Sequence, residues 1–264
     1  MNTVTSTDGT LIAYDRTGSG PSLVFVNGAL STRADVKSVA EVLAPRFTVF
    51  AYDRRGRGDS GDTQPYAVER EIQDLEAIVQ EAGGQALVFG HSSGAALALE
   101  AVVRGLAATR LALYEPPYIV DGSRPPVPVD YVPTLRRLID EGRAGDAVAY
   151  FWQVGILMPP EAIAQMRSAP WFAGIEALGH TLLYDGEVMG DHMRGMPLPQ
   201  EWATKATLRT LVLDGDQSPA SMRNAVEAVV QLLPNAERRT LNGVGHGAPP
   251  DVLAPVLEEF FLRA

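Results

Sequence analysis

A Gly-x-Ser-x-Gly pattern at residues 90–94, with Ser92 at its centre, leaves this chain few possible architectures. The pattern follows the apolar run 86–89 and precedes the small-residue run 95–99, so a strand, a sharp turn and a helix are expected in that order. Both glycines are needed because a Cβ atom at position 90 or 94 would collide with neighbouring backbone. The turn would lift the Ser92 hydroxyl above the edge of a sheet, where a nucleophile can act.

A glycine-flanked histidine near the C-terminus is the expected partner of this serine. His246 lies in the segment 243–247, shortly after the strand-like run 239–241. A serine hydroxyl needs a general base, and the ordinary pKa of histidine, about 6.5, suits it to accept and return a proton near neutral pH. The chain order expected with such a turn is serine, then a carboxylate, then histidine.

Short apolar runs alternate with helical stretches over most of the chain. Asp8-Gly9 is a hairpin signal between two strands. Strands are expected at 3–7, 11–15, 22–26, 47–52, 86–89, 110–114, 210–213 and 237–241, and helices at about 33–43, 67–82, 93–105, 219–233 and 250–262. This alternation predicts an α/β fold with a mostly parallel sheet and helices on both faces.

The alternation stops between residues 116 and 205, which contain proline, methionine, tryptophan and short helical pieces at 134–141, 146–157 and 160–167. We therefore expect a core formed by residues 1–115 and 206–264, with a helical lid of residues 116–205 inserted after the sixth strand. Such an insertion would cover the crevice at the carboxyl ends of the strands, where open α/β sheets bind ligands.

Composition narrows the classes of partner. A chain of 264 residues with 46% hydrophobic content can bury a large core. Its formal net charge of −10 argues against nucleic acid or an anionic membrane as a partner, and the lack of cysteine excludes disulfides and thiolate metal sites. Neither a signal-like N-terminus nor a run long enough for a membrane span is found. We expect a soluble, cytoplasmic monomer or homodimer.

A basic segment at 53–58 permits two other interpretations. It could be an arginine-glycine segment that binds RNA, but it is short, unrepeated and directly follows a strand-like run, so a structured turn is expected. Residues 56–61 also match the dinucleotide pattern Gly-x-Gly-x-x-Gly. A dinucleotide fingerprint opens a helix at once, whereas residues 62–65 intervene here. No cofactor and no metal are expected.

With these motifs in view, the chain resembles proteins of the α/β-hydrolase fold over nearly its full length. The motifs are VNGA at 26–29, YDRRGRGDS at 52–60, GHSSG at 90–94 and GH at 245–246. The second is especially typical of the group of esterases, enol-lactonases and cofactor-free haloperoxidases. The resemblance implies that Ser92 is the nucleophile, His246 the general base, and the backbone N–H groups of Ala29 and Ser93 an oxyanion hole. Asn27 stands where the family carries histidine.

The carboxylate is the open question of the site. Members of the fold commonly place it three residues beyond a glycine after the seventh strand, and the residue at that position here is Ser218. A neutral hydroxyl does not stabilise an imidazolium as a carboxylate does. The candidates are Glu115, Asp216 and Asp214.

We expect Glu115 to be the acid, with Asp216 and Asp214 as alternatives. Glu115 ends the buried-strand run 111–114, and two prolines follow it, so it lies at the carboxyl end of its strand. A buried carboxylate is costly unless it is paired, and a protonated histidine is a suitable partner. Haloalkane dehalogenases and some lactone hydrolases of this fold place their acid in the same way.

The resemblance implies a serine-dependent hydrolase of a carboxylic ester or lactone, acting through an acyl-enzyme. Alternatives on the same fold are a cofactor-free perhydrolase, a lyase or cyclase, and, more remotely, a ligand receptor with a vestigial triad. Apolar bulk in the insertion predicts a small apolar substrate. The residues expected to contact it are Leu30, His91, Tyr118, Trp152, Met158 and Trp171.

Overall fold

A computed structural model describes residues 1–263 and places eight strands in one sheet, in the order β1-β2-β4-β3-β5-β6-β7-β8. The strands are β1 (Asn2–Thr5), β2 (Leu11–Gly18), β3 (Ser22–Val26), β4 (Thr48–Tyr52), β5 (Ala86–His91), β6 (Ala108–Tyr114), β7 (Thr210–Gly215) and β8 (Ala236–Leu241). The β1–β2 and β2–β4 pairs are antiparallel, and every other pair is parallel. The predicted mostly parallel sheet and the initial hairpin are confirmed.

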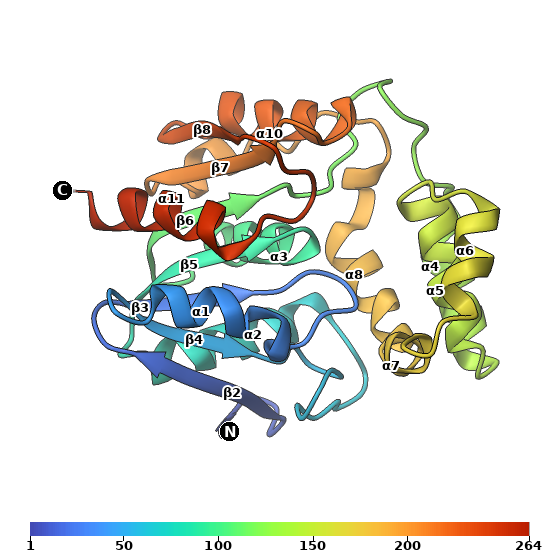
Figure 1. The fold of residues 1–264 in the computed structure, drawn as a ribbon, viewed down its shortest axis with the longest axis horizontal. Coiled ribbons are helices and arrows are strands. Elements are labelled where there is room, and N and C mark those ends of the chain that lie inside the picture. The colour runs from blue at the N-terminus through green and yellow to red at the C-terminus, as the bar shows by residue number, and fades with distance from the viewer. Residues whose placement is uncertain (264) are drawn as a thin grey trace.

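The central strands are short and apolar because helices cover both of their faces. Every residue of β4 and β7 is buried. Helices α1 (Lys37–Leu43) and α11 (Pro250–Leu262) pack on one face, while α2 (Val68–Glu81), α3 (Ser93–Val103) and α10 (Ala220–Leu232) pack on the other (Figure 1). The five helices predicted for the core are thus present. Four of them have ends shifted by at most two residues, while the helix predicted at 33–43 starts as the 3₁₀ helix η1 (Arg33–Val36) and continues as α1.

The insertion after β6 is helical, as predicted, and lies beyond the carboxyl ends of the parallel strands (Figure 1). We use the name lid for residues 116–205, which contain a series of short helices. They are α4 (Tyr131–Asp140), α5 (Ala144–Tyr150), the π-helix η2 (Phe151–Gly155), α6 (Pro160–Arg167), α7 (Phe172–Ala177), the 3₁₀ turns η3 (Gly179–Thr181) and η4 (Gly190–Met193), α8 (Leu182–Met189) and α9 (Trp202–Lys205).

Two features of the lid differ from the sequence prediction. The single helix expected at 146–157 is α5 followed by a π-helix that ends at Gly155. Helix α8 was not predicted, because it is buried on almost all sides and therefore lacks the polar stripe that reveals a surface helix. In Figure 1 it lies between the sheet and α4 to α6. Within residues 1–263, no helix combines the length and apolarity needed to span a bilayer.

Candidate active site

Ser92 occupies the strained turn between β5 and α3, with φ 56° and ψ −128°. A Cβ atom on Gly94 would lie 2.2 Å from the carbonyl oxygen of Val26, and one on Gly90 would lie 2.6 Å from the Cα of Ala95. The predicted need for glycine at both positions is therefore confirmed. A non-glycine residue in such a conformation costs about 1–3 kcal/mol, which the surrounding packing must offset.

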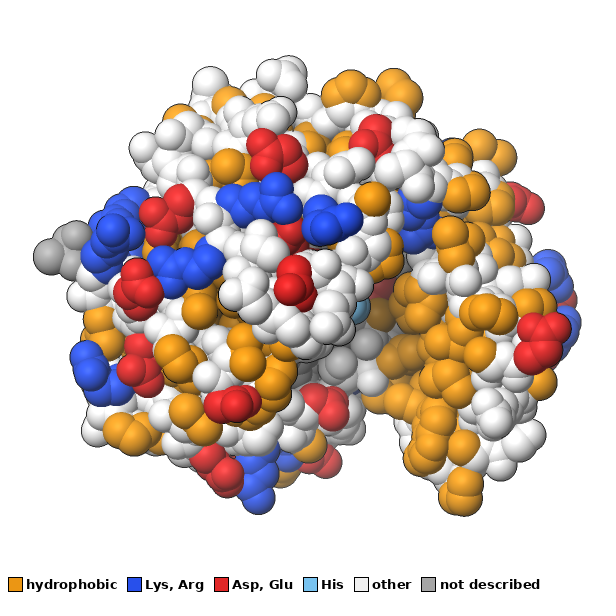
Figure 2. Space-filling model, turned by 45° about the horizontal axis from the view of Figure 1, so that its top comes forward, with side chains coloured by type: hydrophobic (Ala, Val, Ile, Leu, Met, Phe, Trp, Pro, Cys, Tyr) orange, Lys and Arg blue, Asp and Glu red, His pale blue; other side chains and the backbone are white. Residues whose placement is uncertain are grey.

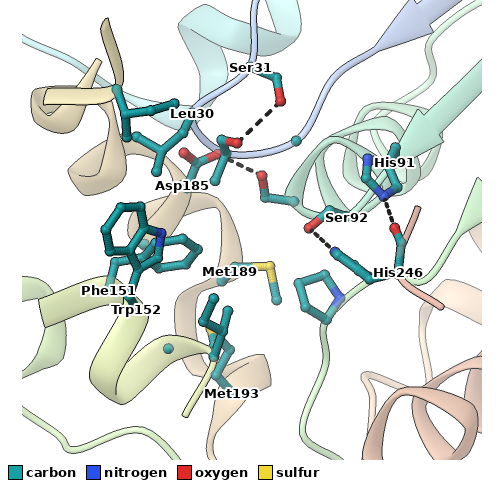
Figure 3. Close-up of a pocket in the computed structure, with 18 of the residues that line it drawn as sticks. Leu30, Ser31, His91, Ser92, Phe151, Trp152, Asp185, Met189, Met193 and His246 are labelled. Atoms are coloured by element: carbon teal, nitrogen blue, oxygen red, sulfur yellow. Dashed lines mark hydrogen bonds between the residues drawn. The ribbon is translucent and has the colours of Figure 1, made fainter. Parts of the chain in front are cut away.

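Three side chains from distant segments form one hydrogen-bonded chain. His246 Nε2 lies 3.0 Å from Ser92 Oγ (Figure 3), and His246 Nδ1 lies 2.7 Å from Glu115 Oε2. The other carboxylate oxygen of Glu115 accepts the backbone N–H of Gly215 at 2.8 Å. With Nδ1–H donating to Glu115, Nε2 is left as the acceptor that faces the serine hydroxyl.

The carboxylate of Glu115 is fully buried, yet it is held in its charged form. Burial by itself raises the pKa of a carboxyl group. Here the hydrogen bonds from His246 and from the N–H of Gly215 outweigh burial, so the pKa of Glu115 lies below its ordinary value. A charged carboxylate next to Nδ1 is what stabilises an imidazolium on the other side of the ring.

The two alternative acids are occupied elsewhere. Asp214 is buried and accepts hydrogen bonds from Arg238 at 2.5 Å and from the hydroxyl of Thr240 at 2.8 Å. Asp216 is exposed and accepts the N–H of Gly243 at 2.8 Å. Both lie in or beside the β7 end that the sequence indicated, but neither contacts the histidine.

His91 supports the histidine loop from the other side. Its Nε2–H donates to the backbone carbonyl of His246 at 2.6 Å, and the two rings lie 4.9 Å apart between centroids. Burial, followed by the neighbouring His246 charge, lowers the pKa of His91 to about 4. The ring is therefore neutral near pH 7, and a neutral ring can still donate its Nε2–H to the carbonyl. A protonated His91 would place a second positive charge beside a protonated His246, which is unfavourable.

The loop after β3 lies directly against the serine. A Cβ atom on Gly28 would approach the Cβ of Ser92 to 2.8 Å, so only glycine allows this contact. Ala29 and Ser93 both line the cavity above the serine. Because α3 begins at Ser93, the N–H of that residue has no carbonyl partner within the helix and is free to face a ligand.

The basic segment 53–58 forms a turn after β4, as predicted, and all three of its arginines are buried. Arg54 pairs with Glu71 at 2.7 Å and with Asp185 of α8 at 2.8 Å, while Arg57 pairs with the same Asp185 at 2.8 Å. The two arginines also donate to the carbonyls of residues 27 and 28. The sequence did not reveal this network, because its carboxylates come from separate helices.

A cavity of about 360 Å³ opens over Ser92 between the core and the lid. Figure 2 shows the hollow, with hydrophobic side chains spread over the lid wall. Of the predicted substrate contacts, Leu30, His91, Trp152 and Trp171 line it. Lining residues that the sequence did not single out are Ser31, Pro117, Arg124, Tyr131, Phe151, Gly155, Met166, Ile175, Asp185, Gly186 and Met222.

Two expected contacts, Tyr118 and Met158, lie outside the cavity, which corrects their assignment. Tyr118 is buried against the rings of Trp202 and His192, with centroids 5.7 Å away in each case. Met158 lies just beyond the π-helix and is tied by its backbone N–H to the carbonyl of Trp152 at 2.8 Å. Their apolar character serves packing within the lid, which sequence alone does not separate from ligand contact.

In the part of the chain that the structure describes, no three His, Asp or Glu side chains are grouped so that they could hold a metal ion. The polar groups at the cavity floor are instead paired with one another, as described above.

Comparison with known proteins places this geometry in a family. A model described as "Alpha/beta hydrolase family" matches residues 23–256. The chain belongs to the alpha/beta hydrolase family. This hydrolase is similar to an alpha/beta hydrolase from Sphaerobacter thermophilus, at 55% identity and a TM-score of 0.92 over 98% of this chain and 100% of the other.

Two other relatives of this hydrolase have named activities, and a third is uncharacterized. The non-heme haloperoxidase of Rhodococcus erythropolis is 27% identical over 94% of this chain and 93% of its own. The enol-lactonase of Burkholderia xenovorans shares the fold, with a TM-score of 0.73 at 19% identity over 99% of this chain and 100% of the other. The match to YraK of Bacillus subtilis, an uncharacterized hydrolase, is 35% identical but spans only 36% of this chain and 37% of that protein.

We predict that His91 makes stability depend on pH. Its folded-state pKa of about 4 lies below the ordinary value of 6.5, so the unfolded chain binds a proton in this range that the folded chain does not. The free energy of unfolding should therefore fall by up to about 1.4 kcal/mol per pH unit as the pH drops from 6.5 towards 4. Urea unfolding of wild type and His91→Gln between pH 7 and 4.5 checks this, and parallel curves would contradict it.

Proposed function

We propose that this hydrolase cleaves a carboxylic ester or lactone through an acyl-enzyme formed on Ser92. The observation that carries the proposal is the hydrogen-bonded chain from Ser92 through His246 to Glu115, which faces a cavity that Ala29 and Ser93 also line. Nucleophile, base and orienting acid lie within hydrogen-bond reach, as acyl transfer requires.

In the proposed mechanism His246 Nε2 accepts the hydroxyl proton as Ser92 Oγ bonds to the carbonyl carbon. Glu115 stabilises the imidazolium that results, while the N–H groups of Ala29 and Ser93 stabilise the oxyanion. The ester C–O bond then breaks, and His246 returns the proton to the leaving alkoxide. A water molecule repeats the sequence on the acyl-enzyme and releases the carboxylic acid.

The walls of the cavity support a substrate with an apolar part. Four side chains face the space above the serine (Figure 3): Phe151 and Trp152 of the π-helix, Met189 at the end of α8, and Met193 of η4. Methionine adapts its shape to different ligands, so the cavity suits a range of apolar acyl or alcohol groups. The enol-lactonase that shares this fold supports a small ester or lactone as the substrate class.

Perhydrolysis is the second candidate, because one relative that matches nearly the whole chain is a haloperoxidase. The same acyl-enzyme would then be attacked by hydrogen peroxide in place of water. An assay for bromide oxidation in acetate and peroxide distinguishes the two activities. A fluorophosphonate should label Ser92 in a hydrolase and in a perhydrolase. A ligand receptor with an unreactive triad would stay unlabelled.

We expect Ser92→Ala and His246→Ala to remain folded and to lose roughly 10⁴-fold or more in turnover, because the two groups act as a unit. The assay uses p-nitrophenyl esters of graded chain length and a set of lactones, and circular dichroism checks the fold. Turnover close to wild type in either variant would rule out the proposed mechanism.

The same ester series tests the apolar cavity. We expect kcat/KM to rise with the length of the acyl chain until the cavity is filled, because each buried methylene contributes about 0.8 kcal/mol. A higher kcat/KM for short, hydrophilic esters across the series would contradict this expectation.

The acid is tested by comparing Glu115→Gln, Asp214→Asn and Asp216→Asn. We expect Glu115→Gln to lose roughly 10³- to 10⁴-fold in kcat, because it leaves the imidazolium without a charged partner. The two aspartate variants should keep most of their activity, and thermal unfolding shows whether each is folded. An Asp214 or Asp216 variant that is folded but inactive, beside an active Glu115→Gln, would reverse the assignment.

A further inference from the structure

Arg124 is the one arginine or lysine among the described residues that line the substrate cavity. Its Nε donates to the carbonyl of Pro125 at 3.3 Å, and its Nη2 donates to the carbonyl of Val154 at 3.2 Å. Within residues 1–263, no carboxylate oxygen lies within 4.0 Å of its guanidinium, and its Nη1 has no hydrogen-bond partner. A half-buried cation thus faces the cavity with donors to spare.

The other arginines of the lid show that this lack of a partner is particular to Arg124. Each of them has an acidic side chain within 4.0 Å; they are Arg136, Arg137, Arg143, Arg167 and Arg194. Burial also lowers the pKa of Arg124, as expected where no anion compensates the charge. The acidic group of the cavity, Asp185, is already neutralised by two buried arginines.

We propose that Arg124 binds a carboxylate carried by the substrate, at the end remote from the ester or lactone bond. The guanidinium matches a carboxylate in shape and charge and binds it with two parallel hydrogen bonds where geometry allows. The apolar walls would hold the chain between the two groups. The substrate class is then an ester or lactone that bears a second, ionised carboxyl group. This inference rests on the proposed function.

The kinetic test compares p-nitrophenyl monoesters of dicarboxylic acids, from adipate to suberate, with the same compounds capped as methyl esters. Wild type should favour the ionised compound in kcat/KM at the chain length that reaches Arg124. In Arg124→Gln the preference should fall roughly 10- to 100-fold, through KM, and Arg124→Lys should keep part of it. Arg136→Gln, which removes one exposed lid charge away from the cavity, should keep the preference of wild type.

A binding test separates failure of this inference from failure of the proposed function. Calorimetry on Ser92→Ala measures the affinities for monomethyl and dimethyl adipate, with and without Arg124→Gln, and needs no turnover. Tighter binding of the monomethyl ester that depends on Arg124 supports the inference even if no ester is hydrolysed. Equal binding, or a preference that survives Arg124→Gln, overturns it, while hydrolysis of neutral esters leaves the proposed function in place.

A separate observation concerns the peptide group between Gly28 and Ala29. Arg57 Nη1 donates to the carbonyl oxygen of Gly28 at 2.5 Å. Because a peptide group is planar and trans, fixing this oxygen also fixes the N–H of Ala29, which points the opposite way. Arg57 is in turn held by Asp185, whose second oxygen accepts the hydroxyl of Ser93 at 2.7 Å.

We infer that Asp185 is a positioning residue for both donors of the oxyanion hole, and this also rests on the proposed function. One carboxylate from lid helix α8 orients Ala29 through Arg57 and anchors Ser93 directly. The side chain of Asp185 lines the cavity but is almost fully buried, in agreement with a supporting role. Loss of its charge should weaken binding of the transition state more than binding of the substrate.

Asp185→Asn is tested against Asp74→Asn as a matched control. Asp74 also pairs with a buried arginine, Arg55, at 2.7 Å. Unlike Asp185, neither Asp74 nor Arg55 lines the cavity. Both variants should lose thermal stability, because each removes a charged partner from a buried arginine. At a temperature where both are folded, Asp185→Asn alone should lose roughly 10²-fold in kcat with a similar KM.

A trifluoromethyl ketone, which forms an oxyanion on reaction with serine, provides the second measurement. Asp185→Asn should lose affinity for it in parallel with kcat, while Asp74→Asn should keep the affinity of wild type. Equal losses in the two variants, or a loss confined to KM, would show that Asp185 is merely structural. Absence of binding to wild type would instead contradict the proposed acyl-enzyme.

Discussion

The buried pairing of Arg54 and Arg57 with Asp185 joins the three parts of this molecule that meet at the active site. The arginines follow β4, the carboxylate belongs to lid helix α8, and the backbone that they hold belongs to the loop after β3. Removing one partner of such a pair leaves a buried charge and commonly costs about 3–5 kcal/mol. Lid and core are therefore fixed to each other at α8, and the other lid helices cover the cavity from this anchor.

The polar and apolar parts of the site come from different regions of the fold. The hydrogen-bonded groups lie at the carboxyl ends of the strands. The backbone is strained there, since Leu30, Ser92 and Glu115 all have positive φ. Dense packing around the parallel strands holds these conformations in place. The lid supplies mainly apolar surface, with Arg124 as its one cation at the cavity among the described residues.

The fold and the reacting groups could be predicted because each depends on local signals. A run of buried apolar residues, a strand-to-helix turn with glycine on both sides, and a proline pair after Glu115 each limit the backbone without reference to distant segments. The lid was less predictable. Helix α8 lacks amphipathic periodicity, and Tyr118 and Met158 pack inside the lid although their side chains are as suited to a ligand as that of Trp152.

By itself the sequence determined the order in which the strands and helices of the core follow one another along the chain. It also determined the strained turn at Ser92 and a short list of acids for His246. Only the tertiary structure decided which acid meets the histidine, because Asp214 and Glu115 end neighbouring strands and differ in the partners that surround them. It also decided that the arginines of segment 53–58 are buried. Their carboxylates lie up to 131 positions away in the sequence, and no local pattern encodes a pairing made through space.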